Sequence, residues 1–128
     1  MKIAFDSKRA FNNLTGLGNY SRSVINSIAS IRTNDELYLA TPKLNPQIFK
    51  PKNNNIKILQ PSMFHNSHYW RFRGVNKQLN DLNIDIYHGL SNEIPYKIQI
   101  KSIVTIHDLL FLKYPSFYNY IDRKIYHV

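Results

Sequence analysis

A pair of glycines follows the first apolar run of the sequence and is the first candidate for chemistry. The run KIAFD (residues 2–6) precedes NLTGLGNYS (residues 13–21), which contains Gly16, Leu17 and Gly18. Glycine permits close approach of the backbone and positive φ, and free amides at the start of a following helix suit an anion such as a phosphate. A tight turn that needs glycine only for its conformation is the alternative interpretation.

The residues around these glycines argue against two common nucleotide sites. A dinucleotide fingerprint would carry a third glycine where Ser21 stands, and an acidic residue at the end of the second predicted strand, where the sequence has Thr41 and Pro42. A P-loop would place Gly-Lys-Ser/Thr after the glycines, and the sequence has none there. The pattern therefore favours neither an NAD or FAD site nor a P-loop.

Two histidines end predicted strands, which is where a parallel α/β sheet presents groups to a ligand. His88 ends IDIYH and His107 ends SIVTIH. A structural, hydrogen-bonded role is the alternative for each ring. Asp108 follows His107 and is expected to cap the turn or to orient that ring, because one carboxylate without a partner makes a poor acid–base pair.

Polar side chains in two loops are candidates for binding hydroxyl groups or anions. Asn92 and Glu93 follow the fourth predicted strand, and their amide and carboxylate groups could pair with a hydroxyl-rich ligand. Lys8 and Arg9 follow the first strand, and Arg9 is the better phosphate ligand because of its planar fork. Solvated loops are the alternative for both pairs.

Five strands and three helices are predicted to position these residues. Apolar residues in four-residue steps predict helices, and β-branched apolar runs ended by proline or loop residues predict strands. The predicted strands are residues 2–6, 36–41, 56–60, 84–88 and 102–107, and the predicted helices are residues 19–31, residues 68–82 and a last helix that opens at Pro115.

Strands that alternate with helices and lack a polar face predict a mainly parallel sheet covered on both sides. Right-handed crossovers then narrow the topology to a Rossmann-like three-layer α/β domain with strand order 3-2-1-4-5. The ligand crevice of such a sheet lies beyond the carboxyl ends of its strands, and this places the glycine loop in the predicted site.

Composition and charge bound the classes of function. The 128 residues have room for one domain, and the absence of cysteine excludes disulfides and thiolate metal sites. No apolar run approaches the roughly 18 to 20 residues of a membrane span, so we expect a cytoplasmic protein. A net charge of +9 predicts an anionic partner. A basic module for nucleic acid or another polyanion is one hypothesis, although no helix-turn-helix, zinc or RNP signature supports it.

Three stretches, taken together and in order, resemble the N-terminal domain of family 4 (group 1) glycosyltransferases. They are FDSKRA with TGLGNYSR (residues 5–10 and 15–22), YHGLSNEIP (residues 87–95), and VTIHDLLF with the following YP (residues 104–111 and 114–115). Each motif alone is weakly specific, whereas their combination and spacing over nearly the full chain are specific.

The resemblance implies a GT-B fold, in which two Rossmann-like domains face each other across a cleft. Residues 1–128 would form the acceptor-side domain, and the donor-binding C-terminal domain is absent from this chain. The implied reaction is retaining, metal-independent hexosyl transfer from a nucleotide-sugar to a sugar or lipid-linked glycan acceptor, with no cofactor and no nucleic acid. With only one wall of the cleft, this chain alone is expected to be inactive.

The resemblance also implies roles for individual residues by position. The backbone of Gly16, Leu17 and Gly18 would approach the donor diphosphate, and His107 would lie beside the donor sugar near the reacting carbon. The remaining candidates would lie on the acceptor side or behind the site: Arg9, His88, Asn92, Glu93 and Asp108. No metal ligand is implied.

A stretch of aromatic and basic residues, YWRFR (residues 69–73), lies on the second predicted helix. Such a stretch usually packs its rings in the core and leaves its charges in water. The alternative is peripheral docking on an anionic membrane, at its inner face, because glycosyltransferases of this type often use lipid-linked acceptors. Phe117, Ile121 and Ile125 keep helical spacing up to Val128 without a capping signal, so the sequence is expected to be a fragment.

Overall fold

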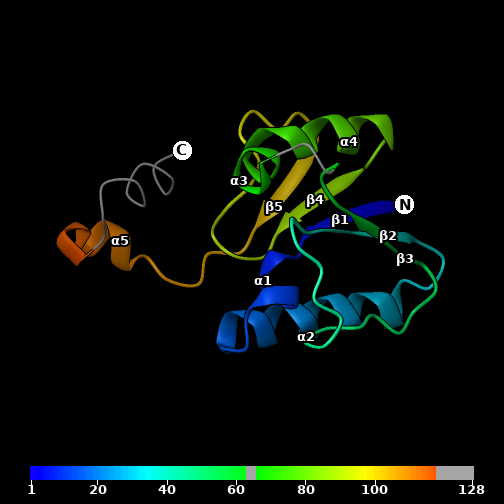
Figure 1. The fold of residues 1–128 in the computed structure, drawn as a ribbon, viewed down its shortest axis with the longest axis horizontal. Coiled ribbons are helices and arrows are strands. Elements are labelled where there is room, and N and C mark those ends of the chain that lie inside the picture. The colour runs from blue at the N-terminus through cyan, green and yellow to red at the C-terminus, as the bar shows by residue number, and fades with distance from the viewer. Residues whose placement is uncertain (63–65, 118–128) are drawn as a thin grey trace.

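A five-stranded, entirely parallel sheet forms the centre of the computed structural model, which describes residues 1–62 and 66–117 (Figure 1). The strand order is β3-β2-β1-β4-β5, so the predicted order 3-2-1-4-5 is confirmed. The strands are β1 (Lys2–Asp6), β2 (Glu36–Ala40), β3 (Ile56–Leu59), β4 (Ile86–Gly89) and β5 (Lys101–Val104).

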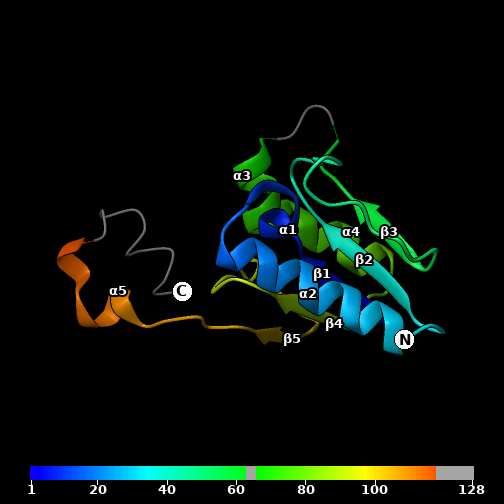
Figure 2. The ribbon, with the colours of Figure 1, turned by 90° about the horizontal axis from the view of Figure 1, so that it is seen from below.

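Helices cover both faces of the sheet and make it the middle layer of three. Helix α2 runs along one face and α4 along the other (Figures 1 and 2). The helical elements are α1 (Lys8–Asn12), α2 (Gly16–Ile31), α3 (Ser67–Tyr69), the π-helical turn η1 (Trp70–Gly74), α4 (Val75–Asp81), α5 (Leu110–Lys113) and the 3₁₀ turn η2 (Pro115–Phe117). The chain is therefore a Rossmann-like three-layer α/β domain.

Alternate residues of the central strands feed two separate hydrophobic cores, because successive side chains of a strand point to opposite faces. Phe5 and Leu39 pack with Ile25 of α2 in one core, whereas Ala4 and Tyr38 belong to the other. The second core also contains Trp70, Val75, Leu79, Ile84 and Tyr87. Both helices are thus anchored to the sheet, and this fixes the loops that leave its carboxyl edge.

Three element boundaries differ from the predictions in ways that affect the site. Helix α2 begins at Gly16 and not at residue 19, so the glycines form its first turn. The predicted helix 68–82 is three consecutive helical pieces, α3, η1 and α4. Strand β5 ends at Val104, so His107 lies beyond the strand and not at its end. Of the helix predicted from Pro115, only the turn η2 falls within the described residues.

The edge strand β5 and the segment after it carry exposed apolar side chains. Ile103, Val104, Ile106 and Leu109 are all exposed, and α5 lies to one side of the three layers (Figure 2). Within residues 1–62 and 66–117, no helix has the length and apolar character needed to cross a membrane.

Candidate functional site

The loop between β1 and α2 is folded around the side chain of Asn13. Its Oδ1 accepts hydrogen bonds from the N–H of Thr15 at 2.8 Å, from the Thr15 hydroxyl at 2.7 Å and from the N–H of Gly18 at 3.1 Å. The guanidinium of Arg22 donates to the carbonyl oxygens of Ala10 and Asn13 at 2.8 and 2.9 Å. One asparagine and one arginine of α2 therefore fix the course of this loop.

Gly18 is required by close packing and not by an unusual backbone angle. A Cβ atom at Gly18 would lie 1.8 Å from the carbonyl oxygen of Asn13, whereas one at Gly16 would meet nothing within 4 Å. No described glycine has a positive φ. Neither glycine of this loop therefore uses the positive φ that glycine permits, and the close backbone approach that it also permits is observed at Gly18.

Two backbone amides at the start of α2 remain without a partner among the described residues. They belong to Gly16 and Leu17, because the first N–H groups of a helix have no carbonyl to bond within it. The helix dipole adds partial positive charge at the same place. The expectation of a free amide at Gly18 is wrong, because Asn13 already accepts its hydrogen bond.

His107 is held against both the loop after β4 and the first turns of α2. Its ring Nε2 donates to the carbonyl oxygen of Leu90 at 2.8 Å, and its backbone N–H donates to Asn92 Oδ1 at 2.9 Å. Its ring meets that of Tyr20 edge-on, with centroids 4.8 Å apart and planes at 89°. Since a carbonyl can only accept, Nε2 is the donor in this hydrogen bond, and Nδ1 has no hydrogen-bond partner among the described residues.

His88 lies deeper, on the face of the sheet that α2 covers. Its Nε2 is 3.0 Å from the hydroxyl oxygen of Thr105, which is in turn 3.1 Å from the hydroxyl of Tyr20. The ring packs on Phe5 with centroids 5.9 Å apart. Burial lowers the pKa of His88 and favours the neutral ring. His88 is thus linked to the site through Thr105 and Tyr20.

Asn92 and Asp108 support the backbone of the site. Asn92 adopts φ 56°, and its N–H donates to the carbonyl of Thr105 at 2.9 Å while its side chain holds His107. Asp108 Oδ1 accepts from the N–H of Leu110 at 3.1 Å, so it caps the turn into α5. Of the two roles expected for Asp108, the turn cap is the one observed, and Leu90 and Tyr20 orient the His107 ring.

A buried ionic cluster occupies the neighbouring part of the carboxyl edge. Arg71 of η1 donates to both oxygens of Asp6, with its closest contact at 2.7 Å, and its Nη1 lies 2.6 Å from Glu93 Oε2. The side chains of Arg71 and Asp6 are 16% and 4% exposed. Burial lowers the pKa of Arg71, but the charge and hydrogen bonds of Asp6 and the charge of Glu93 raise it above its ordinary value.

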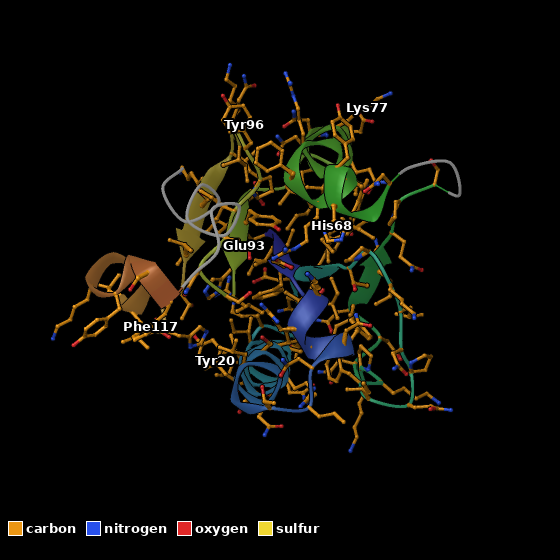
Figure 3. All side chains as sticks on the ribbon, turned by 60° about the vertical axis from the view of Figure 1, so that its left-hand side comes forward. Tyr20, His68, Lys77, Glu93, Tyr96 and Phe117 are labelled. Carbon is orange, nitrogen blue, oxygen red and sulfur yellow. The ribbon has the colours of Figure 1, made fainter. Side chains whose placement is uncertain are left out.

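Glu93 therefore does not lie in a solvated loop, which was the alternative to a binding role. In Figure 3, Glu93 lies at the middle of the molecule, with Tyr20 below it, Tyr96 above it and His68 to its right. Gly89 permits this position, because a Cβ there would lie 2.2 Å from the Glu93 carbonyl oxygen as the loop folds back over β4. Arg71 was expected to leave its charge in water, and that expectation is wrong.

Lys8 and Arg9 lie beside this cluster on the short helix α1. Burial lowers the pKa of Lys8, and the nearby charges of Arg71 and Arg9 lower it further, against the opposing effects of Glu93 and Asp6. The Arg9 Nε is buried without a hydrogen-bond partner among the described residues. Neither cation has a side-chain partner among the described residues.

Sequence reasoning missed Asp6, Asn13, Tyr20, Arg71 and Thr105. Asp6 carried a signal, because a carboxylate that ends a buried central strand must find a partner. The partner, Arg71, is 65 residues away in the chain and is turned inward by the π-helical turn. No local sequence pattern marks such a turn.

No group of three or more His, Asp or Glu side chains is placed to hold a metal ion within the part of the chain that the structure describes. No protein-family model, curated protein or solved structure matches the chain. The assignment of function therefore depends on the sequence motifs and on the geometry of the carboxyl edge.

Proposed function

We propose that this chain is the acceptor-side domain, and one half of the GT-B fold, of a retaining, metal-independent glycosyltransferase of the hexosyltransferase type. It would bind a nucleotide-sugar donor opposite a second domain and present a sugar or lipid-linked glycan acceptor. The observation that carries the proposal is the pair of unpartnered amides at Gly16 and Leu17 on the same edge of the sheet as His107. The order of the motifs along the chain supports it.

The chemistry of this pair fits the departure of a nucleoside diphosphate. Negative charge accumulates on the diphosphate as its bond to the sugar breaks, and fixed amides at a helix N-terminus stabilise that charge without a metal. A preorganised donor of this kind contributes about 3 kcal/mol to transition-state stabilisation. The open space at Gly16 leaves room for a phosphate to approach the backbone.

His107 would act beside the donor sugar. Its Nδ1 and its backbone carbonyl can accept hydrogen bonds, and electron-rich groups stabilise an oxocarbenium-like carbon. The contact with Tyr20 fixes the ring relative to the first turn of α2, so the amides and the histidine keep a constant relation. Because the donor would touch only one wall of its cleft, we expect negligible turnover by the 128-residue chain alone.

Amide NMR of the ¹⁵N-labelled chain tests the proposal. UDP and GDP, added in turn, should shift the amides of Gly16 and Leu17 more than those at the far end of α2. Gly16→Ala should fold normally, because its Cβ meets no atom, yet it should weaken binding at least about tenfold by blocking the approach to the amides. Ser30→Ala, on the last turn of α2, is the matched control. The proposal is contradicted if Gly16→Ala binds the nucleotides as tightly as the unaltered chain, or if neither nucleotide binds.

The same samples can test the alternative function, which is a basic module for nucleic acid or another polyanion. Filter binding of single- and double-stranded oligonucleotides over a salt series would show micromolar affinity with a steep salt slope for such a module. We expect no such affinity. Tight, strongly salt-dependent binding would favour the alternative.

We also propose a peripheral contact with the cytoplasmic face of an anionic membrane. The rings of Phe72 and Tyr96 stack with centroids 5.2 Å apart, and Phe72 is 46% exposed. Arg73 is exposed beside Phe72, and Lys97 Nζ lies 5.4 Å from the Tyr96 ring centroid. Exposed aromatic rings flanked by cations suit a lipid headgroup region.

Sedimentation with vesicles tests this contact. Vesicles that contain anionic lipid should bind the chain at moderate salt, and neutral vesicles should not. A Phe72→Ser/Arg73→Gln variant should lose most of the bound fraction, whereas Lys50→Gln, on the β2–β3 connection, should lose little. Absence of binding at every salt concentration contradicts the membrane contact and leaves the transferase proposal standing.

A further inference from the structure

The charged residues at the centre of the carboxyl edge do not balance. Asp6 ends β1, and Lys8 and Arg9 begin α1 after one intervening residue, while Glu93 follows β4 and Arg71 comes from η1. Lys8 feels the charges of the other four residues, and Arg71 feels those of both carboxylates. Within this cluster one positive charge is left over.

The surplus falls on Lys8 and Arg9, because Arg71 binds both carboxylates. Asp6 and Glu93 each lie within 2.7 Å of an Arg71 nitrogen. Neither the Lys8 ammonium nor the Arg9 guanidinium has a hydrogen-bond or ion-pair partner among residues 1–62 and 66–117. The two cations are therefore close to each other, partly buried and unpaired.

The position of this pair in the fold favours a ligand. Strands β1 and β4 are neighbours in the sheet, and the connections that follow them pack on opposite faces, which is the arrangement of a topological switch point. Lys8 and Arg9 follow β1 at this point, and Glu93 follows β4. Ligands of parallel α/β sheets bind at this topological switch point.

We propose that Lys8 and Arg9 bind a phosphate group at the switch point between β1 and β4, and that Arg71 makes this site available by holding Asp6 and Glu93 in ion pairs. A phosphate would accept hydrogen bonds from the Arg9 guanidinium, which has no partner among the described residues, and from the Lys8 ammonium, and it would relieve the repulsion between these cations. Without Arg71, the two carboxylates would take Lys8 and Arg9 as their own partners.

The source of the phosphate rests on the proposed function, which offers two. One is the diphosphate of the nucleotide donor, and the other is a phosphate carried by the acceptor. Both present the same group to Lys8 and Arg9. A phosphate of the acceptor would bind together with the nucleotide, whereas a phosphate of the donor would exclude a second phosphate ligand.

Sequential titrations of the full 128-residue chain test the proposal. The chain is first saturated with UDP, or with GDP if that binds more tightly, and is then titrated with glucose 6-phosphate, with glucose as the uncharged control. Shifts of the Lys8 and Arg9 signals on the second addition support the site and assign it to an acceptor phosphate. Shifts of the same signals by the nucleotide, with competition from glucose 6-phosphate, support the site and assign it to the donor.

Variants and the lysine pKa complete the test. Lys8→Gln/Arg9→Gln should weaken phosphate binding at least about tenfold, and Lys50→Gln/Lys52→Gln, which removes the same charge from the β2–β3 connection, should not. The pKa of Lys8, followed by ¹⁵Nζ NMR, should rise when phosphate binds. Shifts at Gly16 and Leu17 with no response at Lys8 and Arg9 to any phosphate would overturn this inference and leave the proposed function intact. Shifts at Lys8 and Arg9 with no response at Gly16 and Leu17 would support this inference and contradict the proposed function.

Discussion

The carboxyl edge of the sheet has an ionic part and a neutral part. In the ionic part, Asp6, Arg71 and Glu93 bind one another and are largely shielded from water. In the neutral part, the first turn of α2 faces His107 through Tyr20, and the amides of Gly16 and Leu17 remain unpartnered. In the ionic part both carboxylates bind Arg71, whereas the neutral part keeps two donors free.

This difference suggests that the ionic part stabilises the fold and that the neutral part binds the ligand. The ion pairs of Arg71 hold β1, η1 and the loop after β4 together, and breaking them leaves a carboxylate without its cation. Free amides at a helix end contribute little to folding but are ready to bind an anion. We therefore expect changes in the ionic part to act mainly on stability, and changes at Gly16 to act mainly on binding.

Removal of Arg71 should break the ionic part and give the largest loss of stability. Arg71→Met keeps much of the apolar volume but leaves Asp6, 4% exposed, without its cation. We expect the free energy of unfolding to fall by about 3–5 kcal/mol, measured by urea denaturation. Arg73→Met, on the same helical turn but exposed, should change it by less than about 0.5 kcal/mol. Equal effects of the two variants would contradict the comparison.

Substitution by alanine should destabilise the protein at one of the two glycines of the neutral part and not at the other. Gly18→Ala places a Cβ where the Asn13 carbonyl oxygen lies 1.8 Å away, so the loop or the helix must move. We expect a loss of about 1–3 kcal/mol in the free energy of unfolding. Gly16→Ala meets no atom and should leave stability within about 0.5 kcal/mol. If Gly16→Ala proved the more destabilising of the two, the assigned roles of the glycines would be reversed.

Local sequence patterns predicted the fold well because its two periodicities are clear. The apolar runs of β1 and β2 and the four-residue steps of α2 depend on neighbours in the chain, and the strand order follows from crossover handedness. The predicted ends of strands were less accurate, as at β5, because a strand ends where its hydrogen bonds to the neighbouring strand end. The exposed faces of β5 give no packing signal to mark that end.

The site was predicted only where a residue's role follows from its position in an element. The glycine turn and His107 were found because strand ends and helix starts mark the carboxyl edge. Arg71 and Asn13 were missed because their roles come from contacts: one pairs across 65 residues with Asp6, and the other folds back onto a helix that follows it. Such partners depend on the assembled tertiary structure.

Removal of the Asn13 side chain should weaken the fold slightly while it frees two more amides. Asn13→Ala leaves the N–H groups of Thr15 and Gly18 without their acceptor. We expect a loss of about 1 kcal/mol in the free energy of unfolding, similar to the loss of a helix cap. Asn54→Ala, an exposed control, should cost almost nothing. Nucleotide binding should be retained or improved in Asn13→Ala, and its loss would show that Asn13 touches the ligand.

The smallest effect concerns protonation of His88 beneath the neutral part. Burial lowers its pKa below the ordinary value of 6.5, so the unfolded chain binds this proton more readily than the folded chain. The contribution of His88 to stability is therefore full above pH 6.5 and declines as the pH falls below it. Urea denaturation between pH 7.5 and 5 should show a shallower decline for His88→Gln than for the unaltered chain. Parallel declines would show that the ring accepts a proton without cost, and that the neutral part tolerates a charge as the ionic part does.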